Sequence, residues 1–392
     1  MTTEPTPDRR GFALPVAVFA LVVVGVLVTG GFYMARQETR IGIASEKGTA
    51  AFYLAERGVS DVMENWNAPR FGALLPQETD VVVDTVDGQG FYRVEVTKVS
   101  DWIYMLDSRG VITDGGPMMN GATRRVATLA KIRTIDMRPP AALTTVGGLT
   151  VGGSSQVFGQ DSIPGAWGSD YCDPERLADA PGVMIDDASE VSFSGSNHEL
   201  DGNPPVAEDP TLTSDDLLTY GDLTWTELVS MATNILPGGL TISDTDPDSV
   251  QVGGTWYCNT SLVYNWGHPY QPRSACGNHF PVIYIQGDAR IQSGDFGQGI
   301  LLVDGDLQLN GGYTFFGPVV VRGTVSTAGT GGHFFGGLIA ANVELSTTTV
   351  LGDALVQFSS CAVTRALLNN AALAIASPLP ERSWVDLSNL AN

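Results

Sequence analysis

The chain has 392 residues and a net charge of −22, from 21 basic and 43 acidic side chains. With 43% apolar and only 16% charged residues, this composition argues against a disordered chain and leaves room for two or three domains. Residues 1–140 carry 15 basic and 16 acidic side chains, whereas residues 141–392 carry 6 and 27 and no lysine. Nucleic-acid binding needs clustered basic side chains, so we expect no nucleic acid among the partners.

Residues 12–34 form an uncharged, mostly apolar run of 23 residues. At 1.5 Å per residue, a helix of this length crosses a hydrocarbon core of about 30 Å. A cleaved secretory signal is the alternative. However, the run exceeds the usual ~7–15 apolar residues of such a signal and no Ala-x-Ala site closes it. We therefore predict a single span that contacts the lipid bilayer directly.

The helical pattern continues beyond the membrane as an amphipathic extension over residues 35–68. Apolar residues recur at three- and four-residue spacing and end before Pro69, so one helix of about fifty residues is expected. The apolar residues of this face, which need a partner surface, are Ala50, Ala51, Leu54, Ala55, Val59, Val62, Met63 and Trp66.

Residues 69–138 have the alternation of a small β meander. Four strands are expected, at 80–84, 92–99, 102–112 and 124–133. A sheet of this kind beside the amphipathic helix makes an α+β layer and would bury the apolar face of the helix.

Two segments of this region resemble a known family. Residues 9–14 (Arg-Arg-Gly-Phe-Ala-Leu) and 51–59 (Ala-Phe-Tyr-Leu-Ala-Glu-Arg-Gly-Val) look like the N-terminal region of type IV pilin-like proteins, and most closely of PilX-type minor pilins. The resemblance ends near residue 138. It implies a cytoplasmic leader, residues 1–11, that a prepilin peptidase removes between Gly11 and Phe12. It also implies a helix that packs against other pilin-like subunits, in a single-pass protein of the bacterial inner membrane.

One position departs from that family. Major pilins carry a glutamate five residues into the mature chain, where it neutralises a neighbouring amino terminus inside the apolar filament core. This chain has Val16 at that place, after Pro15. The departure argues against packing as a repeating major subunit and leaves open an initiating or tip position, or a membrane-resident role. A plain single-span anchor is the alternative to the pilin interpretation.

Beyond a linker at 139–142 the sequence repeats. Segments starting at 283, 301, 319 and 338 align on Gly287, Gly305, Gly323 and Asn342, with spacings of 18, 18 and 19. Short apolar triplets, a turn residue suited to positive φ and a second alternating strand are typical of a β-solenoid. This part resembles bactofilins and right-handed β-helices.

The predicted fold class is therefore mainly β with an N-terminal long α-helix. It consists of a pilin-like α+β module followed by a single-stranded β-solenoid with one insertion. We expect first solenoid coils at 143–196, an insertion with a short helix at 197–280, main coils at 281–360 and a C-terminal cap at 361–392.

Four cysteines allow three pairings outside the cytoplasm. We prefer Cys258 with Cys276, which closes a short loop, and Cys172 with Cys361. A zinc site is the alternative, but there is no Cys-x-x-Cys, and His279 follows Cys276 in a single Cys-x-x-His.

Carboxylates give the weak candidates for chemistry, and we expect no resident cofactor. Asp288 and Asp306 lie 18 residues apart and would stack about 5 Å from each other on adjacent coils, with Asp304 nearby. Solenoid enzymes that act on polysaccharides place aspartates on such a face, but a solvated ladder is the preferred interpretation, because the next coil has Thr324 in register and no basic cluster follows to hold an anionic sugar. A calcium loop is weakly suggested by Asp244, Asp246 and Asp248, with Ser249 in place of the usual glycine.

Aromatic residues form two groups. One group belongs to the insertion and would line a carbohydrate or partner surface or pack onto the coils; the other lies near coil corners and would stack inside. The first is Trp256, Tyr257, Tyr264, Trp266 and Tyr270, and the second is Tyr313, Phe315, Phe316, Phe334 and Phe335.

Three functions follow from these patterns. The first is a minor pilin-like protein of a type IV pilus or type II secretion-like system, with an acidic head that is periplasmic or at the cell surface and serves assembly, adhesion or partner binding. The second is a membrane-anchored enzyme acting on polysaccharide, and the third is a bactofilin-like polymerising scaffold. We expect the first, without enzymatic activity.

Overall fold

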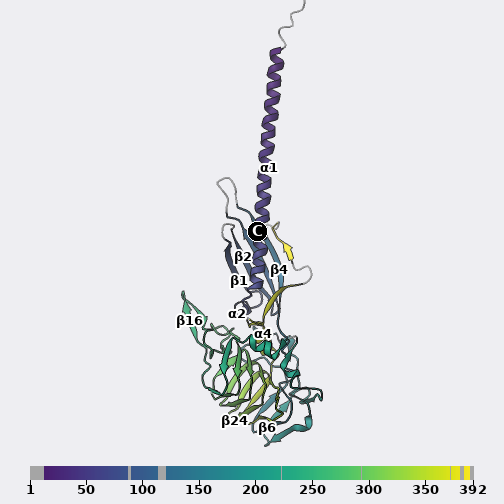
Figure 1. Cartoon of the computed structure of the whole chain (residues 1–392), viewed down its shortest axis with the longest axis vertical. Helices are drawn as coiled ribbons and strands as arrows, with labels where there is room; N and C mark the ends of the chain where they lie inside the picture. The colour runs from purple at the N-terminus through teal and green to yellow at the C-terminus, as the bar shows by residue number, and fades with distance from the viewer. Residues whose placement is uncertain are drawn as a thin grey trace, which may run out of the picture.

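A computed structural model describes residues 13–86, 90–113, 121–221, 223–292, 294–370, 372–379 and 384–388 of the chain. Gly11 and Phe12, the expected processing site, lie outside the described residues. The outer half of a long helix forms one end of the molecule, an antiparallel sheet packs against its inner half, and a region of parallel strands lies at the other end (Figure 1). The protein is thus mainly β with one long N-terminal helix, as predicted.

The long helix, α1, spans Ala13–Glu64, close to the predicted fifty residues. Pro15 lies in its first described turn, where the missing N–H is tolerated. A short helix, α2 (Ala68–Gly72), follows, and the side chain of Asn67 caps it by accepting a hydrogen bond from Arg70 N. The chain therefore turns at Asn67, next to the Pro69 that ends the helical pattern in the sequence.

Antiparallel strands β1 (Thr79–Val86), β2 (Gly90–Ser100), β3 (Ile103–Val111) and β4 (Thr123–Arg133) pair in chain order. The second half of α1 packs on this sheet, mainly on β3 and β4. Gly58 lets the helix come close, because a Cβ there would collide with the ring of Tyr92 and Ser108 Oγ. We call α1 from Gly48 onward, α2 and these strands the α+β module.

The C-terminal tail differs from the expected cap. Helix α4 (Ser360–Leu368) lies against β23 and β25 of the parallel region, defined below. The chain then returns to the module, where β28 (Ile375–Pro378) and β29 (Trp384–Asp386) pair antiparallel with β4. Without the tail, β4 would be an edge strand with unpaired backbone groups; β28 and β29 cover that edge, and the tail does not close a coil.

The rest of the chain forms two mainly parallel sheets, between which the chain passes alternately. The 12-stranded sheet contains β5 (Leu143–Thr145), β7 (Gln156–Phe158), β8 (Val183–Ile185), β10 (Glu199–Asp201), β11 (Val206–Glu208), β14 (Asn234–Pro237), β18 (Val282–Gln286), β20 (Phe296–Gln298), β21 (Ile300–Val303), β23 (Tyr313–Val321), β25 (Gly332–Ala340) and β27 (Leu355–Phe358). The 7-stranded sheet contains β6 (Leu149–Gly152), β9 (Val191–Ser194), β15 (Leu240–Ile242), β19 (Ala289–Ile291), β22 (Leu307–Asn310), β24 (Val325–Ala328) and β26 (Thr348–Val350).

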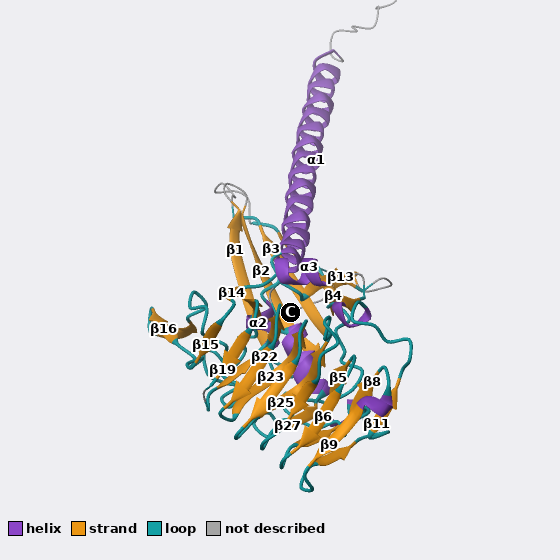
Figure 2. Ribbon diagram, turned by 60° about the horizontal axis from the view of Figure 1, so that its bottom comes forward, coloured by secondary structure: helices purple, strands orange, loops and turns teal. Residues whose placement is uncertain are grey.

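The stacking order of these strands departs from chain order. The strands at 283, 301, 319 and 338 stack in turn, and the strand at 338 then pairs with Leu143 of β5. The first strands of the region therefore extend the far end of the stack (Figure 2). Coils of similar shape and apolar face can cover one another whatever their order in the chain, so the coils that come first in the sequence can stack beyond the strand at 338.

The segment expected to be an insertion also contributes to both ends of the stack. Its strands β10 and β11 pair with β7 and β8, and β14 and β15 pair with β18 and β19. Residues 197–280 are thus partly structural strands and partly loops. The remaining elements are η1 (Pro174–Arg176), η2 (Ala188–Glu190), η3 (Asp216–Leu218), β12 (Thr219–Tyr220), β13 (Leu223–Thr224), α3 (Trp225–Ser230), β16 (Ser249–Val252) and β17 (Thr255–Cys258).

Apolar side chains fill the space between the two sheets and also cover the outer face of the larger one. Tyr313, Phe315 and Phe334 lie in the inner core with Trp266. On the outer face, Phe316 and Phe335 stack at 5.0 Å between ring centroids, and α4 packs over them. Because β21 and β23 are buried on both faces, their sequences are mostly apolar and do not alternate with polar residues.

Candidate functional site

Among the described residues, α1 is the one helix long and apolar enough to cross a membrane. Its first buried residue is Gly48, and the apolar side chains before it are exposed, including Val16 at 52%, apart from the half-buried Ile43. The helix therefore has a bare outer part that needs an apolar environment and an inner part that the module covers.

The candidate catalytic aspartates hold successive coils together. Asp288 Oδ1 accepts a hydrogen bond from the backbone N–H of Asp306, 3.0 Å away. Asp306 Oδ1 in turn accepts from the N–H and hydroxyl of Thr324, at 2.7 and 2.9 Å. Asp304 forms an ion pair with Arg322 at 2.5 Å. Each carboxylate is thus bonded to the neighbouring coil.

The glycines of the repeat make room for this ladder. A Cβ at Gly305 would collide with Asp288 Oδ1, and one at Gly323 would collide with Asp306 Oδ1. Positive φ, expected for all four turn residues, occurs only at Gly287 and Asn342. At Gly305 and Gly323 the lack of a side chain therefore makes room for a neighbouring aspartate and is not needed for a positive φ.

The calcium candidates come together only in part. Asp244 and Asp246 can place ligand atoms within 4.8 Å of each other and of Asp295, whereas Asp248 accepts a hydrogen bond from Asn259. Partial burial and the nearby charges of Asp295 and Asp244 raise the pKa of Asp246. Asp244 and Asp246 are exposed, and exposed acidic groups of this kind are common without an ion.

The structure contains the two disulfides preferred from the sequence, Cys172–Cys361 and Cys258–Cys276. The second disulfide includes Cys276, the cysteine of the Cys-x-x-His sequence, so this residue has no free thiolate to bind zinc. The first joins α4 to the loop before η1, beside the junction of the two regions.

The aromatic residues of the expected insertion separate into buried and exposed groups. Trp266 is fully buried in the inner core, whereas Trp256 and Tyr257 of the β16–β17 hairpin are 58% and 52% exposed. Tyr264 and Tyr270 are also exposed. The hairpin projects from the side of the parallel region (Figure 1).

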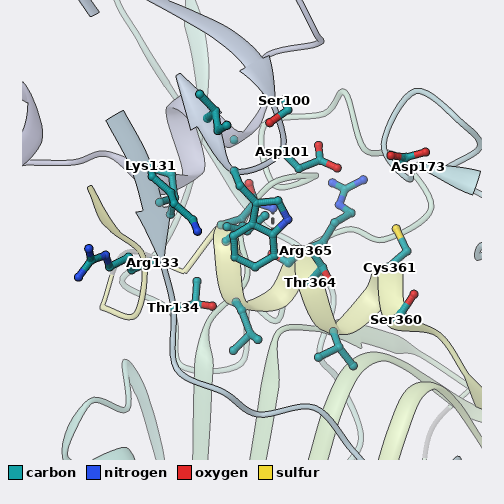
Figure 3. Close-up of a pocket in the computed structure, with 18 of the residues that line it drawn as sticks. Ser100, Asp101, Lys131, Arg133, Thr134, Asp173, Ser360, Cys361, Thr364 and Arg365 are labelled. Carbon is teal, nitrogen blue, oxygen red and sulfur yellow. Dashed lines mark hydrogen bonds between the residues drawn. The ribbon is translucent and has the colours of Figure 1, made fainter. Parts of the chain in front are cut away.

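A cavity of about 1040 Å³ lies where the module meets the parallel region. β2, β3 and β4 form one wall and α4 forms the opposite wall, with Leu379 of the tail at the edge. Figure 3 shows Arg365 rising from α4 with its guanidinium close to Asp101, while Lys131 points toward the centre. Sequence reasoning did not single out any of these residues.

Arg365 is held by an unusual set of neighbours. It is only 5% exposed, and its guanidinium lies 4.4 Å from the ring centroid of Trp167 and 4.6 Å from that of Tyr171. Its Nη2 donates to Asn278 Oδ1 at 3.1 Å. Asn278 also donates to Pro69 O of α2 and to Asn369 Oδ1, so one polar network connects both regions.

Comparisons with protein-family models, with curated proteins and with solved structures find no match for this chain. The function is therefore argued from the sequence pattern and the geometry.

Proposed function

We propose that this chain is a minor pilin-like, membrane-anchored protein of a type IV pilus or type II secretion-like system. In this proposal its head is an acidic β-solenoid that serves assembly, adhesion or partner binding. The observation that carries the proposal is the division of α1 into an exposed apolar part and a part packed on an antiparallel sheet. A simple membrane anchor has no need for the second part.

The length of the bare segment supports lateral packing as well as anchoring. Residues 13–47 of α1 precede its first buried residue and span about 52 Å at 1.5 Å per residue. The hydrocarbon core takes about 30 Å, so about 20 Å of helix remains between the membrane and the module. This length is available for contact with the helices of other pilin-like subunits.

The alternation of the chain between two parallel sheets supports the solenoid interpretation. Neighbouring strands are displaced by 18 residues from Ile283 to Leu301 and from Leu301 to Val319. Backbone hydrogen bonds between coils run along the whole stack, which makes a rigid body suited to display. The exposed Trp256 and Tyr257 would then meet a carbohydrate or surface ligand.

The disulfides support a location outside the cytoplasm. Two bridges are expected in an oxidising compartment and are rare in cytosolic proteins. We therefore propose a single-pass protein of the bacterial inner membrane, with most of the chain periplasmic or at the cell surface. Val16 lies where a repeating subunit carries a glutamate, which favours an initiating or tip position.

The N-terminus of the membrane-extracted protein tests the proposal. We expect intact mass and peptide sequencing to show a start at Phe12, and this start to require both the prepilin peptidase and Gly11. A Gly11→Leu variant should remain uncut. Gly42→Leu is the matched control, because a side chain at that exposed position of α1 meets nothing within 4 Å and should leave processing unchanged.

Two results would contradict the pilin assignment. A chain that keeps Met1 in the presence of the peptidase would reduce the protein to a plain membrane anchor. A cut near residue 30 would make it a secreted head, and the enzymatic alternative with Asp288, Asp304 and Asp306 would then be preferred. Intact phenotype after alanine substitution of all three would remove that alternative.

A further inference from the structure

We propose that the cavity between the module and the parallel region binds an oxyanion, a carboxylate or phosphate group carried by a small molecule, through Arg365 and Lys98. The proposal rests on the charges of this cavity and is independent of the pilin assignment. Lys98 and Arg365 are 8% and 5% exposed, and among the described residues Asp101 is the one acidic side chain that acts on both. Two buried cations thus share one carboxylate.

The unpartnered nitrogen of Arg365 is the first observation. Its Nη1 is buried and makes no hydrogen bond within the described part of the chain. The rings of Trp167, Tyr171 and Phe280 fix the guanidinium but supply no in-plane acceptor. A buried donor without an acceptor is costly, and a guanidinium matches the two oxygens of a carboxylate or phosphate group.

The surroundings of Lys98 are the second observation. Its Nζ lies 3.5 Å from Asp101 Oδ1 and 3.5 Å from Gly72 O, both long for a charged hydrogen bond. Burial lowers the pKa of Lys98; Asp101 offsets part of this effect, and the positive charge of Arg365 adds to it. Burial also lowers the pKa of Arg365, to about 10, so this guanidinium is still cationic at neutral pH. An anion between them would offset both effects.

The other charged residues of the lining leave this balance positive. Asp136 is paired with Arg138 at 3.2 Å, and the remaining cations of the lining, Lys98, Lys131, Arg133 and Arg365, outnumber the remaining carboxylates, Asp101 and Asp173. Lys131 and Arg133 are exposed at the cavity and add positive charge on the approach. An incoming anion is therefore attracted to this place on a chain whose net charge is −22.

The size and walls of the cavity indicate the type of ligand. A volume of about 1040 Å³ is far larger than a bare ion needs. Trp102, Ile103 and Leu379 provide apolar surface next to the charged end. The site therefore suits a small organic acid or an organic phosphate better than an inorganic ion.

Calorimetric titration and thermal unfolding of the full chain in detergent test the proposal. The probes are inorganic phosphate and citrate, with sodium chloride at matched ionic strength to correct for screening. We expect saturable binding of at least one probe, a rise of the unfolding temperature with its concentration, and no such rise with chloride. Binding of phosphate alone or citrate alone would distinguish the two oxyanion classes.

Three variants locate the site. Arg365→Met and Lys98→Met should each raise the Kd about tenfold or more, whereas Arg365→Lys should weaken binding less. Arg290→Gln is the control, because Arg290 lies on β19 and bonds Gln308 away from the cavity; it should bind as the original chain does. Circular dichroism identifies any variant that fails to fold. If Arg365→Met does not fold, the Kd of Arg365→Lys, which keeps the charge, tests whether Arg365 takes part in binding.

Two results would overturn the proposal. The first is the absence of saturable binding of either probe to the original chain, which would make Arg365 a purely structural cation. The second is binding that persists unchanged in a folded Arg365→Met or Lys98→Met variant, which would place the anion elsewhere.

Discussion

The two regions of the molecule are held together in different ways. In the α+β module each strand pairs with its neighbour in the chain, and one face of α1 covers the sheet. In the parallel region strands that are distant in sequence pair, as Leu338 does with Leu143. Antiparallel pairing needs only short turns, whereas parallel pairing needs a long return of the chain. The module therefore depends on local contacts, and the parallel region depends on long-range contacts that must be fixed by other means.

Two features of the structure fix the long-range contacts of the parallel region. The Cys172–Cys361 disulfide spans 189 residues, and the tail strands β28 and β29 bind the end of the chain to β4 of the module. Fixing the ends of a long segment reduces the conformations of the unfolded chain. We expect the parallel region to respond more strongly than the module to changes in long-range connections.

Removal of the long-range disulfide should have the largest effect. In the chain-entropy view, a bridge that closes 189 residues contributes about 5 kcal/mol, whereas one that closes 18 contributes about 3 kcal/mol. The Cys172→Ser/Cys361→Ser variant should therefore unfold at lower denaturant than Cys258→Ser/Cys276→Ser. Equal midpoints under non-reducing conditions would show that loop length does not decide the stability of this region.

A cavity in the inner core should have the next largest effect. Phe315 is fully buried between the sheets, and Phe315→Ala should lower the free energy of unfolding by about 3–5 kcal/mol. Hydrogen exchange should increase in β21, β23 and β25, with little change in β2 and β3 of the module. Phe193→Ala is the control, because Phe193 is 52% exposed. Equal loss of protection in both regions would mean that they unfold as one unit.

Mild acid should weaken the parallel region before the module. Burial lowers the pKa of His279 from 6.5 to about 4, so the unfolded chain binds this proton more readily. The resulting stability is present above pH 6.5 and is lost as the pH falls toward 4, by up to about 3 kcal/mol. His279→Phe should flatten this dependence in denaturation measured between pH 7.5 and 4.5.

The module should respond only at lower pH. Its Arg70–Asp80 hydrogen bond lowers the pKa of Asp80 below 3.8, so that contribution is present above 3.8 and is lost below it. Asp80→Asn is therefore the control and should leave the change between pH 7.5 and 4.5 unaltered. A loss that persists in His279→Phe would assign the acid sensitivity to another group.

The ease of prediction from sequence follows the same division. The period-two alternation in residues 92–99 and the apolar face of α1 predict the module, because each residue's neighbours are close in the chain. The 18-residue spacing also predicts which strands pair between 283 and 338. The spacing does not predict the order in which separate groups of coils stack, because any coil end with a matching apolar face can pack against another coil.

The junction cavity was beyond prediction for a related reason. Lys98 and Arg365 are 267 positions apart and meet only because the tail returns to the module. One signal was present: Arg365 is one of only six basic residues after position 140, and it is the one charged residue of its helix. An arginine at such a position indicates a buried partner or ligand, although the sequence does not say which.

The smallest effect expected is at the carboxylate ladder, which belongs only to the parallel region. Asp306→Ala removes the acceptor for the N–H and hydroxyl of Thr324 and should lower the free energy of unfolding by about 1 kcal/mol, because the bond is exposed to water. Asp306→Asn keeps an acceptor oxygen at the same place and should lose less. Chemical denaturation of both variants measures the difference.

If both variants are as stable as the original chain, the ladder has no structural role. The small space that Gly323 leaves for the carboxylate would then need another explanation, and the enzymatic reading of Asp288 and Asp306 would gain support.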